Sequence, residues 1–93
     1  MLFRSPSSRA LCDGSPCRAA AYRGPVRVRL PAADPGGAGV AMTYYTVDGP
    51  APSASSRMYQ TPFILRRSAK IRFFSVDNAG NAERVKTVTV KVG

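Results

Sequence analysis

Apolar and polar residues alternate along two stretches of this chain, and this period of two constrains the fold more than any other feature. In residues 26–30 every second residue is apolar, and the residues between them are Arg. A similar alternation runs through residues 84–92, and residues 70–76 give the strongest strand prediction. Because successive side chains of a β-strand point to opposite faces, the pattern predicts half-buried strands. The side chains expected to face inward on the first and last stretches are Val26, Val28, Leu30, Val88, Val90 and Val92.

Shorter segments between these stretches complete an all-β pattern. Residues 40–48 are rich in Thr, Tyr and Val, which favour strands, and residues 57–61 and 63–65 predict two short strands on either side of Pro62. The Gly-rich residues 33–39 predict a loop, and residues 48–50 and 77–81 predict turns. No stretch has a convincing helical period. The sequence therefore predicts an antiparallel β-sandwich of short strands.

The N-terminal residues lack this alternation and contain several Ser and Arg residues between Gly and Pro. We expect residues 1–21 to form an irregular leader, and residues 22–93 to form the β-sandwich. Within the leader, a loose tail is expected up to about Leu11, followed by a tight turn between Cys12 and Cys17.

The composition excludes several kinds of chemistry and topology. The chain has no His and two Cys among 93 residues, so it lacks an imidazole base for a Ser-His-Asp triad and cannot build a four-ligand zinc site from Cys alone. No stretch approaches the ~20 apolar residues that a membrane helix requires. The N-terminus also lacks the apolar run of about 7–15 residues of a secretory signal peptide. We therefore expect either a cytosolic protein or a piece of a longer secreted one.

The acidic residues do not predict a catalytic or metal site. All five lie in or next to predicted turns, and nothing brings two of them together for glycoside hydrolysis. Asp48, Asp77, Asn78 and Asn81 offer oxygen ligands, but calcium takes roughly 6–8 of them, and no EF-hand pattern is present. Asp and Asn at strand ends usually accept hydrogen bonds from turn amides. We therefore expect turn-stabilising side chains, no metal, no cofactor and no catalytic residue.

Several motifs resemble bacterial immunoglobulin-like modules. They are the strand-and-hairpin segment of residues 36–49, the Tyr-Gln-Thr-Pro-Phe of residues 59–63, and the C-terminal hairpin formed by residues 73–83 and 86–90. Over about residues 22–92 the chain is similar to chitobiase/β-hexosaminidase C-terminal-type domains, which are similar in role to fibronectin type III modules. The resemblance implies an Ig-like antiparallel β-sandwich of about seven strands. It also implies a non-catalytic module that lies beside catalytic domains or other repeats in extracellular enzymes.

Cys12 and Cys17 are separated by four residues that include Gly14 and Pro16, and a turn can bring such Cα atoms within bridging range. A disulfide is the favoured interpretation, with two free thiols as the alternative. A redox or metal role is least favoured, because a redox motif needs two intervening residues. The segment also resembles a cysteine pair that precedes many secreted copies of the family. A disulfide would indicate an oxidising, extracellular location.

Tyr44 and Phe74 are the candidate carbohydrate contacts. If their neighbours Tyr45 and Phe73 belong to the core, alternation turns Tyr44 and Phe74 outward. Exposed aromatic rings can stack on sugars, but they can equally pack on a neighbouring module or on Arg stems. Packing or cross-strand pairing is the favoured interpretation, and glycan contact is the alternative.

The net charge of +9 results from 14 basic and five acidic residues. Arg27, Arg29, Lys70 and Arg72 are expected on outer sheet faces, and Lys86 is assigned to the outer face of the last strand. A basic face with stacking aromatics could bind nucleic acid, but no RNA-binding aromatic signature or zinc pattern is present. We interpret the charge mainly as surface composition. Weak adhesion to an anionic polysaccharide or cell-surface polymer is an alternative, and nucleic-acid binding is the least favoured.

The predicted function is that of a non-catalytic accessory or spacer module of a secreted bacterial multidomain protein, attached to a carbohydrate-active or other extracellular enzyme. The expected partners are the neighbouring domains of the same polypeptide, and no membrane span is expected. The alternative is a weak carbohydrate- or cell-surface-binding module. The signal peptide of such a protein would lie outside this sequence.

Overall fold

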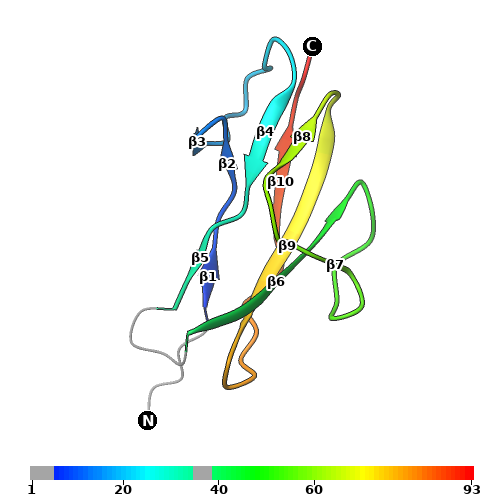
Figure 1. Ribbon diagram of the computed structural model, residues 1–93. Helices are drawn as coiled ribbons and strands as arrows, with labels where there is room; N and C mark the ends of the chain where they lie inside the picture. The colour runs from blue at the N-terminus through cyan, green and yellow to red at the C-terminus, as the bar shows by residue number, and fades with distance from the viewer. Residues whose placement is uncertain (1–5, 35–38) are drawn as a thin grey trace.

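The computed structural model describes residues 6–34 and 39–93, and in these residues it contains strands and turns without a helix (Figure 1). The strand segments are β1 (Ser7–Ser8), β2 (Leu11–Cys12), β3 (Ser15–Pro16), β4 (Val26–Arg29), β5 (Ala32–Ala33), β6 (Val40–Val47), β7 (Arg57–Met58), β8 (Phe63–Leu65), β9 (Ala69–Asp77) and β10 (Lys86–Val90). The parts of the predicted leader and loop that fall on residues 1–5 and 35–38 lie outside the described residues.

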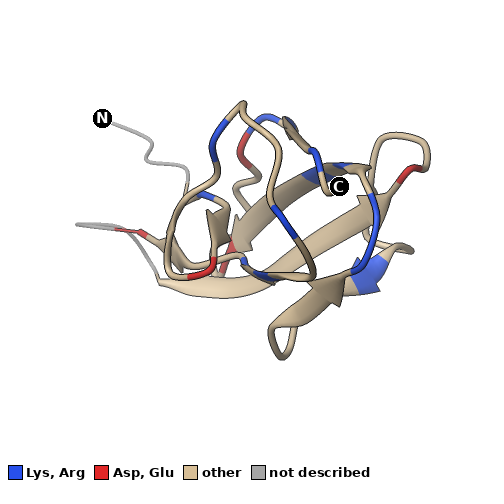
Figure 2. Cartoon of the chain, turned by 90° about the horizontal axis from the view of Figure 1, so that it is seen from above, with Lys and Arg blue, Asp and Glu red and all other residues tan. Residues whose placement is uncertain are grey.

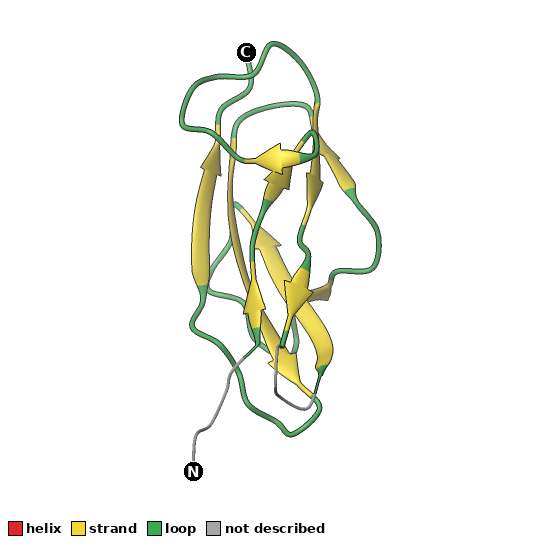
Figure 3. Cartoon of the chain, turned by 90° about the vertical axis from the view of Figure 1, so that its left-hand side faces the viewer, coloured by secondary structure: helices red, strands yellow, loops and turns green. Residues whose placement is uncertain are grey.

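Two four-stranded antiparallel sheets form the two layers of a sandwich (Figures 1 and 3). One has the order β3-β2-β4-β8, and the other has the order β10-β9-β6-β7. The short pair β1-β5 continues the first layer, because β1 precedes β2 and β5 follows β4 along the chain. β1 and β2 can be counted as one interrupted strand, and so can β4 and β5. β3 is the short return strand of the hairpin that β2 begins. Counted in this way, the sandwich has seven main strands. The predicted all-β sandwich is confirmed.

The core lies between the two sheets and consists of the side chains that the alternation turns inward. Val26, Val28 and Val90 are 0% exposed and Leu30 is 1% exposed, whereas the residues between them are exposed. Full burial of each such side chain contributes about 1.5–3 kcal/mol. The inward faces predicted for the first and last stretches are therefore confirmed.

Aromatic rings join the two layers in the middle of the sandwich. Tyr45 of β6 stacks on Phe63 of β8 with ring centroids 4.9 Å apart, and it meets the edge of Tyr59 at 6.4 Å. Since β6 and β8 belong to different sheets, this contact ties one layer to the other. Tyr45 is therefore a core residue, which is the condition under which alternation turns Tyr44 outward.

The prediction of an irregular leader is wrong for residues 7–16. β1 pairs with β5, and β2 pairs with both β3 and β4, so this segment is part of the first layer. Cys12 is 2% exposed and belongs to the core. Two-residue strands are too short to display a period, and β1 and β2 pair with β5 and β4 further along the chain, which is why the alternation does not reveal them.

The prediction that Lys86 lies on the outer face of the last strand is also wrong. Lys86 pairs with the buried Phe73 and shares the inward face of β10 with Val88 and Val90. Its side chain is 42% exposed because it lies at the start of the strand, from where the ammonium group reaches the surface. There it donates hydrogen bonds to the Ser8 carbonyl and the Ser7 hydroxyl.

Glu83 completes this connection between the two ends of the chain. Its carboxylate accepts hydrogen bonds from the backbone N–H and the hydroxyl of Ser8, and from the backbone N–H of Ser75 at 2.9 Å. It also pairs with the Lys86 ammonium at 3.2 Å, and the Glu83 side chain is only 6% exposed. We call Glu83 and Lys86 the β1 clamp, because together they bind the N–H and the C=O of one residue of β1.

Candidate functional site

Cys12 and Cys17 form a disulfide with their Cα atoms 4.8 Å apart, as predicted. It closes the turn between β2 and β3, where Asp13 and Gly14 have φ values of 54° and 86°. Glycine adopts this left-handed region without a steric cost, so Gly14 suits the turn. No free cysteine is present, and one half of the bridge is buried in the core. The bridge is a structural element of the sheet edge.

A groove of about 640 Å³ lies beside this bridge and has Tyr22 in its wall. Two of the side chains that could bind a ligand there, Arg18 and Tyr22, already have intramolecular partners. The Arg18 guanidinium lies 4.3 Å from the centroid of the Tyr22 ring, and the Arg18 backbone N–H donates to the Tyr22 hydroxyl at 3.0 Å. The Tyr22 backbone also bonds to Lys91 and Gly93, so this region anchors the C-terminal end of the chain.

The Tyr44 and Phe74 rings stack on each other on the outer face of β6 and β9, with centroids 5.4 Å apart and planes inclined by 29°. They lie on the side opposite Tyr45 and Phe73, as the alternation predicts. Phe74 is nevertheless only 8% exposed, so it is not the accessible ring that a direct sugar contact requires. Tyr44 is half-buried, and its cross-strand neighbour Met58 is 46% exposed.

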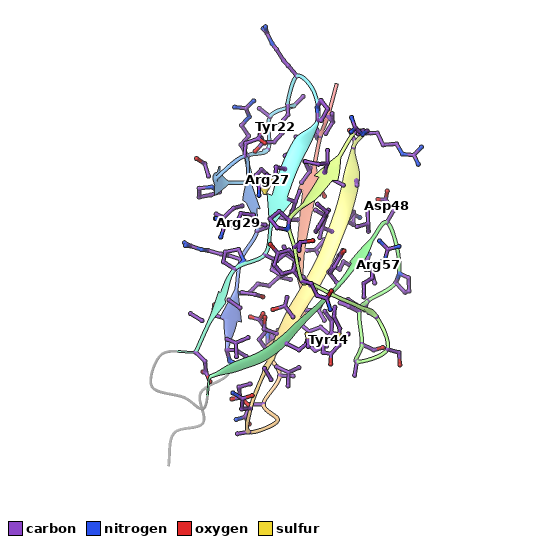
Figure 4. All side chains as sticks on the ribbon, in the orientation of Figure 1. Tyr22, Arg27, Arg29, Tyr44, Asp48 and Arg57 are labelled. Carbon is purple, nitrogen blue, oxygen red and sulfur yellow. A yellow bond between two sulfur atoms is a disulfide. The ribbon has the colours of Figure 1, made fainter. Side chains whose placement is uncertain are left out.

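The loop after β6 folds against this outer face, which helps to explain its reduced exposure. The Arg72 guanidinium donates to the Gly49 carbonyl at 3.2 Å, and the Thr46 hydroxyl donates to the Pro50 carbonyl at 2.8 Å. Thr46 lies two residues from Tyr44 on β6, and Arg72 lies two residues from Phe74 on β9, so both donors are on the same face as the stacked rings. Phe74 therefore packs behind the ring of Tyr44, and Tyr44, which is labelled in Figure 4, is the more exposed ring of the pair.

A second surface, the end groove, lies between the end of β6 and strand β8. Its volume is about 660 Å³, and it is lined by Val47, Asp48, Ile64, Leu65, Arg66, Arg67 and Ala69. Val47 is 38% exposed and Ile64 is 49% exposed, so two aliphatic side chains from different sheets reach solvent at one place. Asp48, Arg66 and Arg67 surround them with charge. Sequence reasoning missed this groove, because nothing local relates residue 47 to residue 64.

A third surface, the basic face, is the outer side of the β3-β2-β4-β8 sheet. Arg27 and Arg29 of β4 are exposed there, and Figure 4 shows both on the side of β4 that is turned away from β6 and β9. Figure 2 shows how few acidic residues lie among the Lys and Arg residues of the described part of the chain. Among the residues that the structure describes, one ion pair forms, between Glu83 and Lys86, and it lies elsewhere.

The acidic side chains named as possible calcium ligands act as turn acceptors. The Asp77 carboxylate accepts hydrogen bonds from the Asn81 side chain at 3.0 Å and from the backbone N–H groups of Asn81 and Ala79. These bonds, the Asn81 side chain foremost, lower the pKa of Asp77 against the opposing effect of burial. Asp48 accepts a bond from the Lys70 backbone N–H. In residues 6–34 and 39–93, no three Cys, Asp or Glu side chains gather into a metal-binding group.

The part of the chain that the structure describes has no helix long and apolar enough to cross a membrane. Comparison with curated proteins finds no match, and comparison with solved structures finds none either. Residues 17–87, well over half of the chain, match the family described as the chitobiase/beta-hexosaminidase C-terminal domain. The match includes β4 and β6–β9, which hold the two layers together. The chain therefore belongs to the chitobiase/β-hexosaminidase C-terminal domain family.

Proposed function

We propose that this chain is a non-catalytic accessory module of a secreted bacterial protein, and that it packs against a neighbouring domain and fixes the position of that domain. The observation that carries the proposal is the end groove, where Val47 and Ile64 expose apolar surface inside a charged rim. An apolar centre with a polar rim is the usual anatomy of a protein interface. Interfaces between domains of one chain have the same character.

The shape of the molecule suits such a spacer. Its principal extents are 47 × 25 × 20 Å, and Gly93 lies at the end of the long axis opposite β1 (Figure 1). A polypeptide that enters at β1 and leaves at Gly93 therefore has its flanking segments held apart along the long axis. The clamp on β1 and the bonds between Tyr22 and Gly93 hold both ends of this path.

The proposed extracellular location rests on the disulfide and on the family. Disulfides persist in oxidising environments and are rare in the reducing cytosol. The bridge closes a loop with a sequence separation of five, for which the chain-entropy contribution is about 2 kcal/mol. A module that loses this contribution in a reducing compartment has a narrower margin of stability.

The packing proposal is tested in the longer polypeptide that carries this module with its neighbour. The double variant Val47→Asp, Ile64→Asp places charge in the end groove and should separate the unfolding transitions of module and neighbour in scanning calorimetry. The matched control is Thr87→Asp, Thr89→Asp, which adds the same charge on exposed positions of β10 and should leave the coupled transition intact. If the groove variant and the control both unfold as the parent does, the groove is not the interface.

The non-catalytic proposal is tested separately with the purified chain. A chromogenic β-N-acetylglucosaminide should be hydrolysed no faster than in buffer, since the sequence offers no imidazole base and the acidic residues discussed above serve turns and the β1 clamp. Turnover that persists through further purification and disappears in a single-residue variant of this chain would overturn it.

A second candidate function, weak carbohydrate binding, is favoured by the Tyr44–Phe74 stack alone. Tyr44 would contact the sugar, and Phe74 would hold the ring in place. The test is retention on chitin and cellulose of the parent and of Tyr44→Ala, with Thr89→Ala as the control. Equal retention of parent and Tyr44→Ala would remove this candidate.

A further inference from the structure

We propose that the basic face binds a linear acidic polysaccharide, and that Arg27 and Arg29 bind its carboxylate groups. This inference rests on the proposed function, since it names a ligand that an extracellular accessory module would hold. Ile64 of the end groove is the cross-strand neighbour of Arg27, so the groove adjoins the basic face, but the two proposals depend on different residues and can fail separately.

The register of the sheet places three Arg residues near one another on the basic face. Arg27 and Arg29 are two residues apart on β4 and project to the same side, so their Cα atoms are separated by about 7 Å. Arg29 lies opposite Leu11 of β2, and the Arg9 backbone N–H donates to the Pro31 carbonyl. Arg9 is exposed between the buried Ser8 and the inward Ala10, so it lies on the same outer side, diagonal to Arg29.

These guanidinium groups have little opposing charge within the protein. Asp13 is the acidic residue beside them, and its carboxylate accepts a hydrogen bond from the backbone N–H of Arg27 at 2.9 Å. Neither Arg27 nor Arg29 forms an ion pair with any described residue. Like charges that are neighbours on one sheet face repel each other, which costs stability. An anionic ligand would remove that repulsion, and this is the physical reason why the face favours one.

The residue types on this face favour a carboxylated sugar polymer over a nucleic acid. Arg presents a planar fork that binds a carboxylate or a phosphate through two parallel hydrogen bonds, so the placement of aromatic rings decides between the two kinds of polymer. Single-stranded nucleic acids are bound largely by stacking of bases on aromatic rings. The rings of the described residues lie in the core, beside the disulfide or on the opposite sheet, and none lies on this face. Arg27 and Arg29 follow each other along β4, as the carboxylate groups follow each other along a linear acidic polysaccharide.

The test uses polygalacturonate, a linear sugar polymer with a carboxylate on each residue, and isothermal titration at low salt, ~0.05 M, with a repeat at ~0.3 M. The parent should bind at low salt and weaken as salt screens the charges. Arg27→Gln, Arg29→Gln should raise Kd by about tenfold or more. Arg27→Lys, Arg29→Lys keeps the charge without the fork, and its affinity should lie between those of the parent and the Gln variant.

The matched control is Lys70→Gln, Lys91→Gln, which removes two positive charges from exposed positions elsewhere. It should change Kd by less than about threefold. Equal loss in the control and the Arg27→Gln, Arg29→Gln variant would show attraction by net charge alone and overturn the inference. Tighter binding of single-stranded DNA than of polygalacturonate at the same salt would also overturn it. A chain that binds neither polymer but keeps its coupled transition with a neighbour refutes this inference and leaves the proposed function standing.

Discussion

Replacing Glu83 should destabilise the protein more than the loss of any other single charge, because this carboxylate satisfies several buried groups at once. It accepts hydrogen bonds from the Ser8 and Ser75 N–H groups and from the Ser8 hydroxyl, and it pairs with Lys86. Ser8 is 1% exposed and Ser75 is 0% exposed, so water cannot readily replace the lost acceptor.

The magnitude follows from these contacts. A buried donor left without a partner costs about 1–3 kcal/mol, and two backbone N–H groups lose theirs in Glu83→Ala. The Lys86 side chain is 42% exposed, so loss of the ion pair itself adds at most about 1 kcal/mol. We expect Glu83→Ala to lose about 3–5 kcal/mol of unfolding free energy. Glu83→Gln keeps one acceptor oxygen but turns an NH₂ group toward the Lys86 ammonium or the Ser8 N–H, so about 2–3 kcal/mol should be lost.

The assay is urea denaturation followed by far-ultraviolet circular dichroism, with Arg84→Ala as the control on the neighbouring exposed residue. The control should change the unfolding free energy by less than about 0.5 kcal/mol. Amide exchange adds a local readout, because the Ser8 and Ser75 amides should lose protection in Glu83→Ala. The reasoning is refuted if Glu83→Ala is as stable as Arg84→Ala and both amides remain protected.

Three further predictions concern the disulfide, one turn and the core. The double variant Cys12→Ala, Cys17→Ala removes the bridge and should lower the unfolding free energy by about 2 kcal/mol and Tm by roughly 8–16 °C in a calorimetric scan. Two free thiols counted in the parent protein after denaturation would show that the bridge does not form. The pKa of Asp77 is lowered on folding from its usual value of about 3.9, so its stabilising contribution is present above that pH and is lost as the pH falls through the lower folded value. Urea midpoints of Asp77→Asn should therefore fall less than those of the parent on acidification below about pH 4, and parallel curves would refute this. Tyr45→Ala removes a ring stacked on Phe63 and should cost about 3–5 kcal/mol in urea denaturation, whereas Tyr45→Phe keeps the stack and should cost less than about 1.5 kcal/mol. Equal losses would mean that the ring is not what holds the two sheets together.

Alternation along the chain correctly predicts which side of the longer strands faces the core. The reason is local, because the two-residue period of a strand is a property of its own backbone. Lys86 illustrates how far the rule extends. Its parity with Val88 and Val90 places it on the inward face, whereas the sequence-based prediction assigned it to the outer face. A long side chain at a strand end satisfies both demands, since its stem can lie inward while its ammonium group reaches solvent.

The covering of Phe74 shows what alternation leaves out. The period correctly places its ring on the outer side of β9, but it says nothing about what lies over that side. A stacked Tyr44 from the neighbouring strand lies against it, and the loop after β6 bonds to the same face. Exposure therefore depends on parts of the chain that the local pattern does not relate to β9.

The sequence by itself determined the all-β class, the inward faces of the long strands, the turn at Asp77 and a cysteine spacing short enough for a bridge, since each depends on residues close together in the chain. Only the tertiary structure decided that residues 7–16 belong to the sheet, that Glu83 and Lys86 clamp Ser8 across sequence separations of 75 and 78, and that Val47 and Ile64 meet in one groove. Each of these depends on which distant strands become neighbours. The pairing of distant strands depends on the apolar surface that both sheets bury together, and the sequence of a single segment does not determine it.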